Sequence, residues 1–203
     1  KAKIQEIEGG YSEGRVETTV TLTSDTTLFE YPVKLKNMKL WDEFHPYTYI
    51  LTALLSKKKS TVDLTGITFG MRKFEIRGKM FYVNGHEVQL RGTVENCDFP
   101  LTGYAPMDIA SWERVFRRCK EYGLNHMRFH SYCPPNAAFA AADKVGFYLQ
   151  PEGPSWPNHG VALGNGRPID TYLMEETIRM AKDYGNHPSF CMLACGNEPA
   201  GRW

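Results

Sequence analysis

The chain has 203 residues, and its 24 basic and 23 acidic side chains give a formal net charge of +1. With 42% hydrophobic and 13% aromatic residues, it has enough apolar material for one or two cored domains and too much for disorder. The balanced charge excludes an overall field that would attract nucleic acid or an anionic membrane, so a neutral partner such as a carbohydrate fits at least as well.

No membrane segment or metal cluster is expected from the remaining composition. No apolar run approaches the roughly 20 residues that cross a bilayer, and the first residues, KAKIQEIEGGYSEG, lack the apolar centre of a signal peptide. We expect that the mature chain starts here or that an upstream segment was removed. The five cysteines form an odd set without CxxC spacing, which favours neither a metal site nor a disulfide framework, so the compartment stays open.

The first part of the chain has the alternating pattern of β-strands. Apolar residues recur at short intervals among Thr, Val, Tyr and Phe, and turn formers or charges separate the runs. The pattern predicts a small antiparallel immunoglobulin-like β-sandwich over residues 1–78. The lysine triplet at 57–59 is expected to be a solvated loop. Strands are expected within 15–24, 29–36, 47–56 and 67–76.

After Gly78 the pattern changes to strands that alternate with helices. Ser111 is expected to cap the first helix and Asp170 the third, while a proline begins the second helix and Gly146 ends it. The strands are expected within 87–95, 126–130, 147–153 and 189–198, and the helices within 111–123, 134–146 and 171–185.

This alternation predicts a parallel sheet with right-handed crossovers. An open doubly wound sheet usually carries a glycine-rich phosphate loop after its first strand, but that place holds RGTVENCDFP. The sequence therefore favours the first half of an eight-fold β/α barrel over residues 79–203. Barrel enzymes carry their chemistry at the carboxyl ends of the strands, which is where the polar residues of this half gather.

The strongest single feature is the pair Asn197-Glu198 at the end of the last expected strand. Glycoside hydrolysis needs a carboxylic acid that protonates the glycosidic oxygen, and an adjacent amide can hydrogen-bond the sugar's 2-hydroxyl. Taken alone, the pair is also compatible with a helix-capping Asn followed by a solvated Glu.

Several segments in the same order resemble the central region of glycoside hydrolase family 2, which includes β-galactosidases, β-glucuronidases and β-mannosidases. They are FGMRKFEIRGKMFYVNGHEVQLRG, EYGLNHMRFHSYCPP, AADKVGFYLQPEGP and NHPSFCMLACGNEP. The resemblance begins near Leu40-Trp41 and extends to Pro199. It implies that Glu198 is the acid/base carboxyl and that Asn197 is the Asn that precedes it.

The resemblance also suggests substrate-binding residues at the ends of the earlier strands. Arg91 matches a family Arg that supports the sugar pocket, although a structural salt bridge explains it equally well. Asn96 stands near the usual position of a His, in a segment that ends at Asp98, and Asn cannot take a proton as His does. The order His130-Ser131 departs from the family's Ser-His, so His130 is either a sugar ligand or a satisfied core group.

Two more candidates follow the third strand of this half. Glu152 matches a family carboxylate near the pocket, and Trp156 is either a platform for a sugar face or a packed aromatic residue. No metal or other cofactor is expected, because the six histidines form no HxH or HExxH pattern. A serine nucleophile is not indicated either, because GxSxG is absent.

The mechanism implied by the resemblance is the double displacement of a retaining β-glycosidase. The family's nucleophilic Glu comes from a later strand than any in this sequence, so we expect the 203-residue chain to be inactive alone. We also expect the exposed edges of the half barrel to promote self-association. For the full-length enzyme a secreted or periplasmic location is favoured. The alternative is a noncatalytic carbohydrate-binding or scaffolding module.

Overall fold

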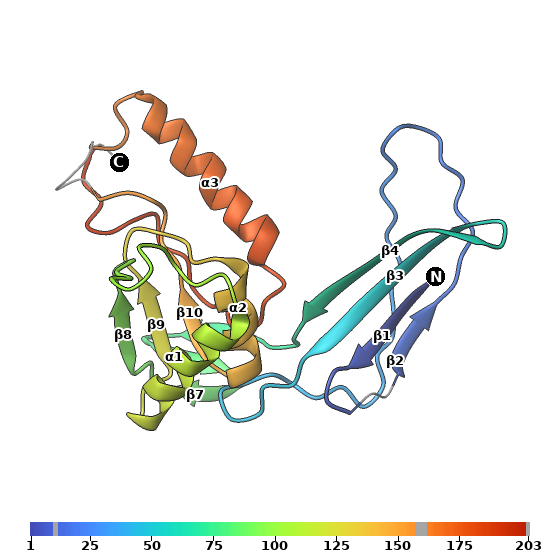
Figure 1. Cartoon of the computed structure of the whole chain (residues 1–203), viewed down its shortest axis with the longest axis horizontal. Helices are drawn as coiled ribbons and strands as arrows, with labels where there is room; N and C mark the ends of the chain where they lie inside the picture. Colours follow the sequence, from blue (N-terminus) through green and yellow to red (C-terminus); the bar gives the residue numbers. More distant parts are fainter. Residues whose placement is uncertain (10–11, 157–161, 202–203) are drawn as a thin grey trace.

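The computed structural model describes the chain except for residues 10–11, 157–161 and 202–203. The elements form two bodies that are joined by the segment after β4 (Figure 1). The strands are Ala2–Glu6 (β1), Ser12–Val16 (β2), Tyr49–Lys57 (β3), Ser60–Phe69 (β4), Phe74–Arg77 (β5), Met80–Val83 (β6), His86–Val88 (β7), Gly92–Glu95 (β8), His126–Phe129 (β9) and Tyr148–Gln150 (β10). The helices are Ile109–Glu121 (α1), Asn136–Val145 (α2) and Pro168–Tyr184 (α3).

The first body is an antiparallel sheet in the order β2-β1-β3-β4. Its β3–β4 hairpin turns at Lys58, whose φ is 56°, so the lysine triplet is the exposed turn that the sequence predicts. Of the strand expected within 15–24, only residues 15–16 belong to a strand, the end of β2, and the strand expected within 29–36 is absent from the structure. Most side chains of that segment are exposed, so its alternation of apolar and polar residues has no buried face to pair with.

The expected boundary at 78/79 falls in the turn between β5 and β6. Strand β5 pairs with β6, and β6 with β7, with Phe74 opposite Val83. Together with the buried Trp41, this small sheet packs against Tyr148 of the second body. The division between sheets therefore lies between Phe69 and Phe74.

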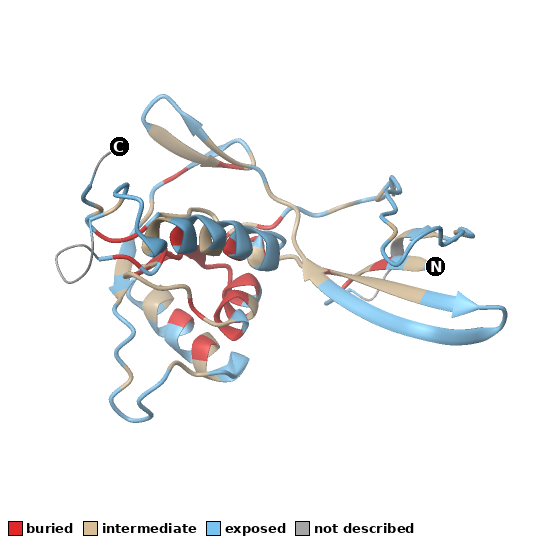
Figure 2. Ribbon diagram, turned by 90° about the horizontal axis from the view of Figure 1, so that it is seen from above, coloured by how far each residue is buried: buried red, intermediate tan, exposed pale blue. Residues whose placement is uncertain are grey.

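The second body is a parallel sheet in the order β10-β9-β8, covered on one face by α1 and α2. Met127, Phe129 and Leu149 pack there against helix residues such as Trp112 and Phe116, and Figure 2 shows the buried positions of the helices on their inner sides. The paired positions Val94, Arg128 and Gln150 point to the other face, because side chains alternate along a strand.

The fourth expected strand is present only as two parallel bridges, Leu149–Phe190 and Glu152–Ala194. They continue the sheet beyond β10 in the direction that a closing barrel requires. The expected strand at 87–95 is divided into β7 and β8.

The helix ends agree with the sequence in one case and differ in two. Helix α2 ends as expected at Gly146, whose φ is 75°. Helix α1 begins earlier than predicted, because the carboxylate of Asp108 accepts a hydrogen bond from the Ser111 amide and Ser111 lies inside the first turn. Helix α3 begins at Pro168, and Asp170 is its third residue.

A buried polar cluster around Asp143 of α2 joins this helix to the segment before the fourth expected strand and to Trp41. His187 Nδ1 lies 2.6 Å from Asp143 Oδ2, and the Ser189 amide donates to the other oxygen of Asp143 at 3.0 Å. The Trp41 indole donates to the Asp143 carbonyl at 2.7 Å. His187 therefore serves the fold.

Candidate active site at the carboxyl edge of the parallel sheet

The predicted polar residues from three successive strands meet at one edge of the sheet. His130 directly follows β9, Glu152 lies two residues after β10, and Asn197 and Glu198 follow the segment that bridges to β10. Because parallel strands end at a common edge, Arg128 and Asn197, which are 69 positions apart in sequence, become neighbours.

A hydrogen-bonded network connects the three strand ends. Arg128 Nη1 donates to Glu152 Oε1 at 2.6 Å and to Asn197 Oδ1 at 3.1 Å. A guanidinium can only donate, so the Asn197 amide must turn its oxygen toward Arg128 and present its Nδ2 donors to other acceptors. Arg128 therefore sets the orientation of the amide that precedes Glu198.

Glu152 is a support for this network. Its side chain is only 2% exposed, Oε1 accepts from Arg128, and Oε2 accepts from the Ser131 amide at 2.9 Å. Both oxygens thus accept hydrogen bonds from within the protein, and the contact with substrate that the sequence suggests for Glu152 stays a prediction. The Ser131 backbone has a φ of 61°, in the left-handed region that non-glycine residues rarely adopt.

Glu198 lies at the exposed end of the cluster. Trp156 Nε1 donates to Glu198 Oε2 at 3.0 Å, and the Trp156 ring meets the His130 ring edge-on, with 4.6 Å between the centroids. His130 Nδ1 lies 3.0 Å from Ser131 Oγ. Glu198 also has a left-handed backbone, with a φ of 45°. Strained backbone at two of these residues is a feature of functional sites.

The close approach of two loops fixes the backbone before Glu198. The Asn197 amide donates to the Ser155 carbonyl at 2.9 Å, and Gly196 has a φ of 154°. A Cβ at Gly196 would lie 2.6 Å from the Ser155 oxygen, so only glycine fits there. The loop that carries Trp156 is thereby joined to the loop that carries Glu198.

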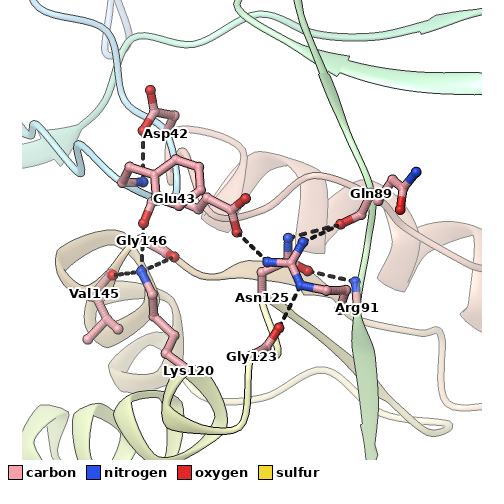
Figure 3. Close-up of polar contacts among 10 residues, drawn as sticks. Asp42, Glu43, Gln89, Arg91, Lys120, Gly123, Asn125, Val145 and Gly146 are labelled. Carbon is pink, nitrogen blue, oxygen red and sulfur yellow. Dashed lines mark hydrogen bonds and ion pairs between the residues drawn. The ribbon is translucent and has the colours of Figure 1, made fainter.

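Arg91 lies elsewhere, and the structure corrects its assignment to the sugar pocket. It precedes β8 at the amino-terminal edge, where its guanidinium reaches Glu43 Oε2 at 3.5 Å, the Gly123 carbonyl at 2.6 Å and the Gln89 carbonyl at 3.2 Å (Figure 3). The side chain of Glu43 is only 7% exposed. The salt bridge that rivalled the pocket assignment is therefore the role that Arg91 has.

Asn96 and Asp98 lie in the exposed loop after β8, at the same edge as Glu198. The Asp98 amide donates to Glu95 Oε1 at 3.3 Å, and burial raises the pKa of the Glu95 carboxyl.

Two further observations concern metals and membranes. Among the described residues, no group of three or more His, Cys, Asp or Glu side chains is placed to hold a metal ion. No helix in this part of the chain is long and apolar enough to cross a bilayer. His159 lies outside the described residues.

Sequence reasoning did not identify Ser131 and Ser155. Each acts through its backbone, Ser131 by its amide and Ser155 by its carbonyl, so residue type carries no signal for these roles. The only hint for Ser131 is its place two residues after the end of β9.

Comparisons with known proteins find relatives for both parts of the chain. Residues 1–72 match the family described as "Glycosyl hydrolases family 2", and residues 74–202 match "Glycosyl hydrolases family 2, TIM barrel domain". A putative beta-glucuronidase from Formosa agariphila is 31% identical over 165 residues, which are 81% of this chain and 19% of that protein. A beta-galactosidase from Thermoanaerobacter pseudethanolicus is 30% identical over 162 residues, 79% of this chain and 21% of that protein.

The solved structures show the same fold. A glycosyl hydrolase family 2 member from Bacteroides cellulosilyticus has a TM-score of 0.83 at 23% identity and covers 98% of this chain and 26% of its own. The beta-glucuronidase from Ruminococcus gnavus in its apo form has a TM-score of 0.80 at 22% identity, over 98% of this chain and 32% of its own. The chain spans about a fifth of the length of the curated relatives named above. The fold is an immunoglobulin-like domain followed by part of a TIM barrel, and the family matches cover residues 1–72 and 74–202. The chain therefore belongs to glycosyl hydrolase family 2.

Proposed function

We propose that this chain supplies the acid/base half of a retaining β-glycosidase that removes terminal β-linked sugars. The observation that carries the proposal is the position of Glu198, which directly follows an amide oriented by Arg128 at the carboxyl edge of the parallel sheet. In the first step Glu198 protonates the departing glycosidic oxygen, and in the second it takes a proton from the attacking water.

The nucleophile is assigned to a part of the protein outside these 203 residues. In a retaining enzyme the two carboxyl groups lie about 5 to 5.5 Å apart across the glycosidic bond. Glu152 is a poor candidate for the second group, because its oxygens are held by Arg128 and the Ser131 amide. We therefore expect no turnover by the 203-residue chain alone.

Asn197 and His130 are assigned to the sugar. Asn197 is 8% exposed and turns its Nδ2 donors away from Arg128, which suits a contact with the sugar's 2-hydroxyl. Asn96 and Asp98 are assigned to the entrance, where the exposed loop after β8 reaches the same edge. Beta-glucuronidase and beta-galactosidase relatives make glucuronides and galactosides the first substrates to test.

The test uses the complete gene product, obtained by reading the encoding gene to its stop codon, and aryl β-glycosides of galactose, glucuronic acid and mannose. We expect hydrolysis in which NMR detects the β-anomer of the sugar first. Glu198→Gln should reduce kcat/KM for a phenyl glycoside by roughly 10²–10⁴-fold, which is the contribution of general acid catalysis. The matched control, Glu121→Gln on the exposed end of α1, should retain wild-type activity.

Two results would refute the proposal. One is full activity of Glu198→Gln on phenyl glycosides. The other is sugar binding without hydrolysis by the complete gene product, which would indicate a noncatalytic carbohydrate-binding module instead.

A further inference from the structure

We propose that Trp156 is a positioning residue for Glu198, and that its indole N–H holds one carboxyl oxygen so that the transferred proton is carried by the other. The inference rests on the proposed function of Glu198. It replaces the expectation that Trp156 is a platform for a sugar face.

The hydrogen bond itself assigns the two oxygens. Trp156 Nε1 lies 3.0 Å from Glu198 Oε2, and an indole nitrogen donates a hydrogen bond but cannot accept one. Oε2 is therefore the acceptor, and because the carbonyl oxygen of a carboxylic acid accepts more strongly than its hydroxyl oxygen, this hydrogen bond favours the proton on Oε1. The donor remains in place whether Oε1 is protonated or not, so the same orientation serves both proton transfers of the double displacement.

The indole is in turn held by the end of the neighbouring strand. The His130 ring meets it at 78° with the centroids 4.6 Å apart, and His130 Nδ1 contacts Ser131 Oγ at 3.0 Å. The Ser131 amide donates to the buried Glu152 carboxylate at 2.9 Å. A continuous series of contacts thus leads from the core of the site to the N–H of Trp156.

The backbone gives a second connection between the two residues. The carbonyl of Ser155, next to Trp156, accepts from the Asn197 amide, next to Glu198, at 2.9 Å. This hydrogen bond fixes the two loops relative to each other at the residues next to Trp156 and Glu198. Trp156 itself is 38% exposed, so it lies at the surface of the site. Trp156 is thus fixed by the contact of its ring with His130 and by the hydrogen bond of the preceding Ser155 carbonyl. Such a residue is suited to positioning a carboxyl group, because a small displacement of a catalytic group strongly lowers the rate.

Substrates that differ in their leaving groups separate the two roles of Trp156. A phenyl leaving group needs protonation by Glu198, whereas 2,4-dinitrophenolate departs without it. Loss of a positioning N–H therefore lowers kcat/KM for the phenyl glycoside alone. Loss of a sugar platform raises KM for both substrates, because the sugar is the same.

The experiment compares Trp156→Phe, which keeps an aromatic ring but removes the N–H, with Trp156→Ala in the complete gene product. We expect Trp156→Phe to lower kcat/KM for the phenyl glycoside by roughly 10-fold, a part of the general acid contribution, and to leave the dinitrophenyl glycoside within about 2-fold. Tyr122→Phe, at the exposed end of α1, is the control and should change neither substrate. Wild-type behaviour of Trp156→Phe on both substrates, or equal losses on both through KM, would overturn the inference.

A spectroscopic measurement on the 203-residue chain tests the hydrogen bond without turnover. The indole N–H signal of Trp156, assigned by its absence in Trp156→Phe, should move in a ¹H–¹⁵N correlation spectrum when Glu198 is changed to Gln. It should stay in place in Glu121→Gln. An unmoved signal in Glu198→Gln overturns the inference even if Glu198 proves catalytic. A moved signal with no activity loss in Glu198→Gln establishes the hydrogen bond but overturns the proposed function, and with it the positioning role of Trp156.

Discussion

Arg128 and Glu152 form an ion pair across the ends of β9 and β10, with 2.6 Å between Nη1 and Oε1. The Glu152 side chain is 2% exposed and the Arg128 side chain 29%. Removing one partner of such a pair leaves a buried charge uncompensated, whereas removing both together costs much less.

We therefore expect Arg128→Met to lower the free energy of unfolding by about 3–5 kcal/mol. The double variant Arg128→Met/Glu152→Gln should recover most of this loss in urea unfolding of the 203-residue chain. The activity of the complete gene product should not recover, since Asn197 Oδ1 has lost its donor in both variants. Arg179→Met, which removes an exposed ion pair on α3, is the control. A double variant no more stable than Arg128→Met would contradict the buried-charge argument.

His126 should make the stability of the chain depend on pH. Burial lowers its pKa from 6.5 to about 4, so between these values the unfolded chain binds a proton that the folded chain does not. The contribution of neutral His126 to the free energy of unfolding is fully present above pH 6.5 and is lost as the pH falls toward 4. The lowered pKa of His126 corresponds to a contribution of about 3 kcal/mol at most to the free energy of unfolding.

The measurement is the difference in unfolding free energy between wild type and His126→Gln at pH 7 and pH 4.5. That difference should shrink by about 2–3 kcal/mol at the lower pH. His86→Gln, on the exposed strand β7, should show no such change relative to wild type. Parallel pH dependence in wild type and His126→Gln would show that His126 is not the group responsible.

Lys120 should contribute more to stability than an exposed lysine does. Its ammonium donates to the carbonyls of Glu43, Val145 and Gly146 at 2.6, 3.0 and 3.3 Å, which joins α1 to the end of α2 and to the preceding domain (Figure 3). Hydrogen bonds from charged groups contribute about 1.5–3 kcal/mol, and a cation at a helix carboxyl end is favourable. Thermal unfolding should therefore show a large loss for Lys120→Met and a small one for Lys144→Met, whose ammonium forms an exposed ion pair with Glu113. Equal losses would mean that the three carbonyls contribute nothing specific.

The unpaired edge of β8 should cause the 203-residue chain to associate. Among the described residues, β8 pairs only with β9, so its other edge presents backbone donors and acceptors. Sedimentation velocity should show a species distribution that grows with concentration. Val94→Lys should reduce association by placing a charge beside that edge, while Leu101→Lys, in the exposed loop that follows, should not. A stable monomer at all concentrations would exclude this edge as an association site.

The residue pattern predicted the parallel sheet and the meeting of Glu152, Asn197 and Glu198, because both follow from where parallel strands end. It did not predict the partner of Arg91, since Glu43 is 48 positions away and lies between two strands, β2 and β3, of a different sheet. The strand expected within 29–36 failed because alternation indicates a strand only when a neighbouring strand is there to pair with it.

The roles of Ser131 and Trp156 could not be read from residue types. Ser131 contributes a backbone amide, and its left-handed conformation is imposed by the turn after β9. Trp156 has the composition of a sugar platform, and only the direction of its N–H distinguishes that role from a hydrogen bond to Glu198.

The contacts of Lys120 and Arg91 with Glu43 hold the two bodies together far from Glu198. Changes in the loops around Glu198 can therefore accumulate without weakening that union. This separation makes the assembly of the chain independent of sequence changes at the candidate site.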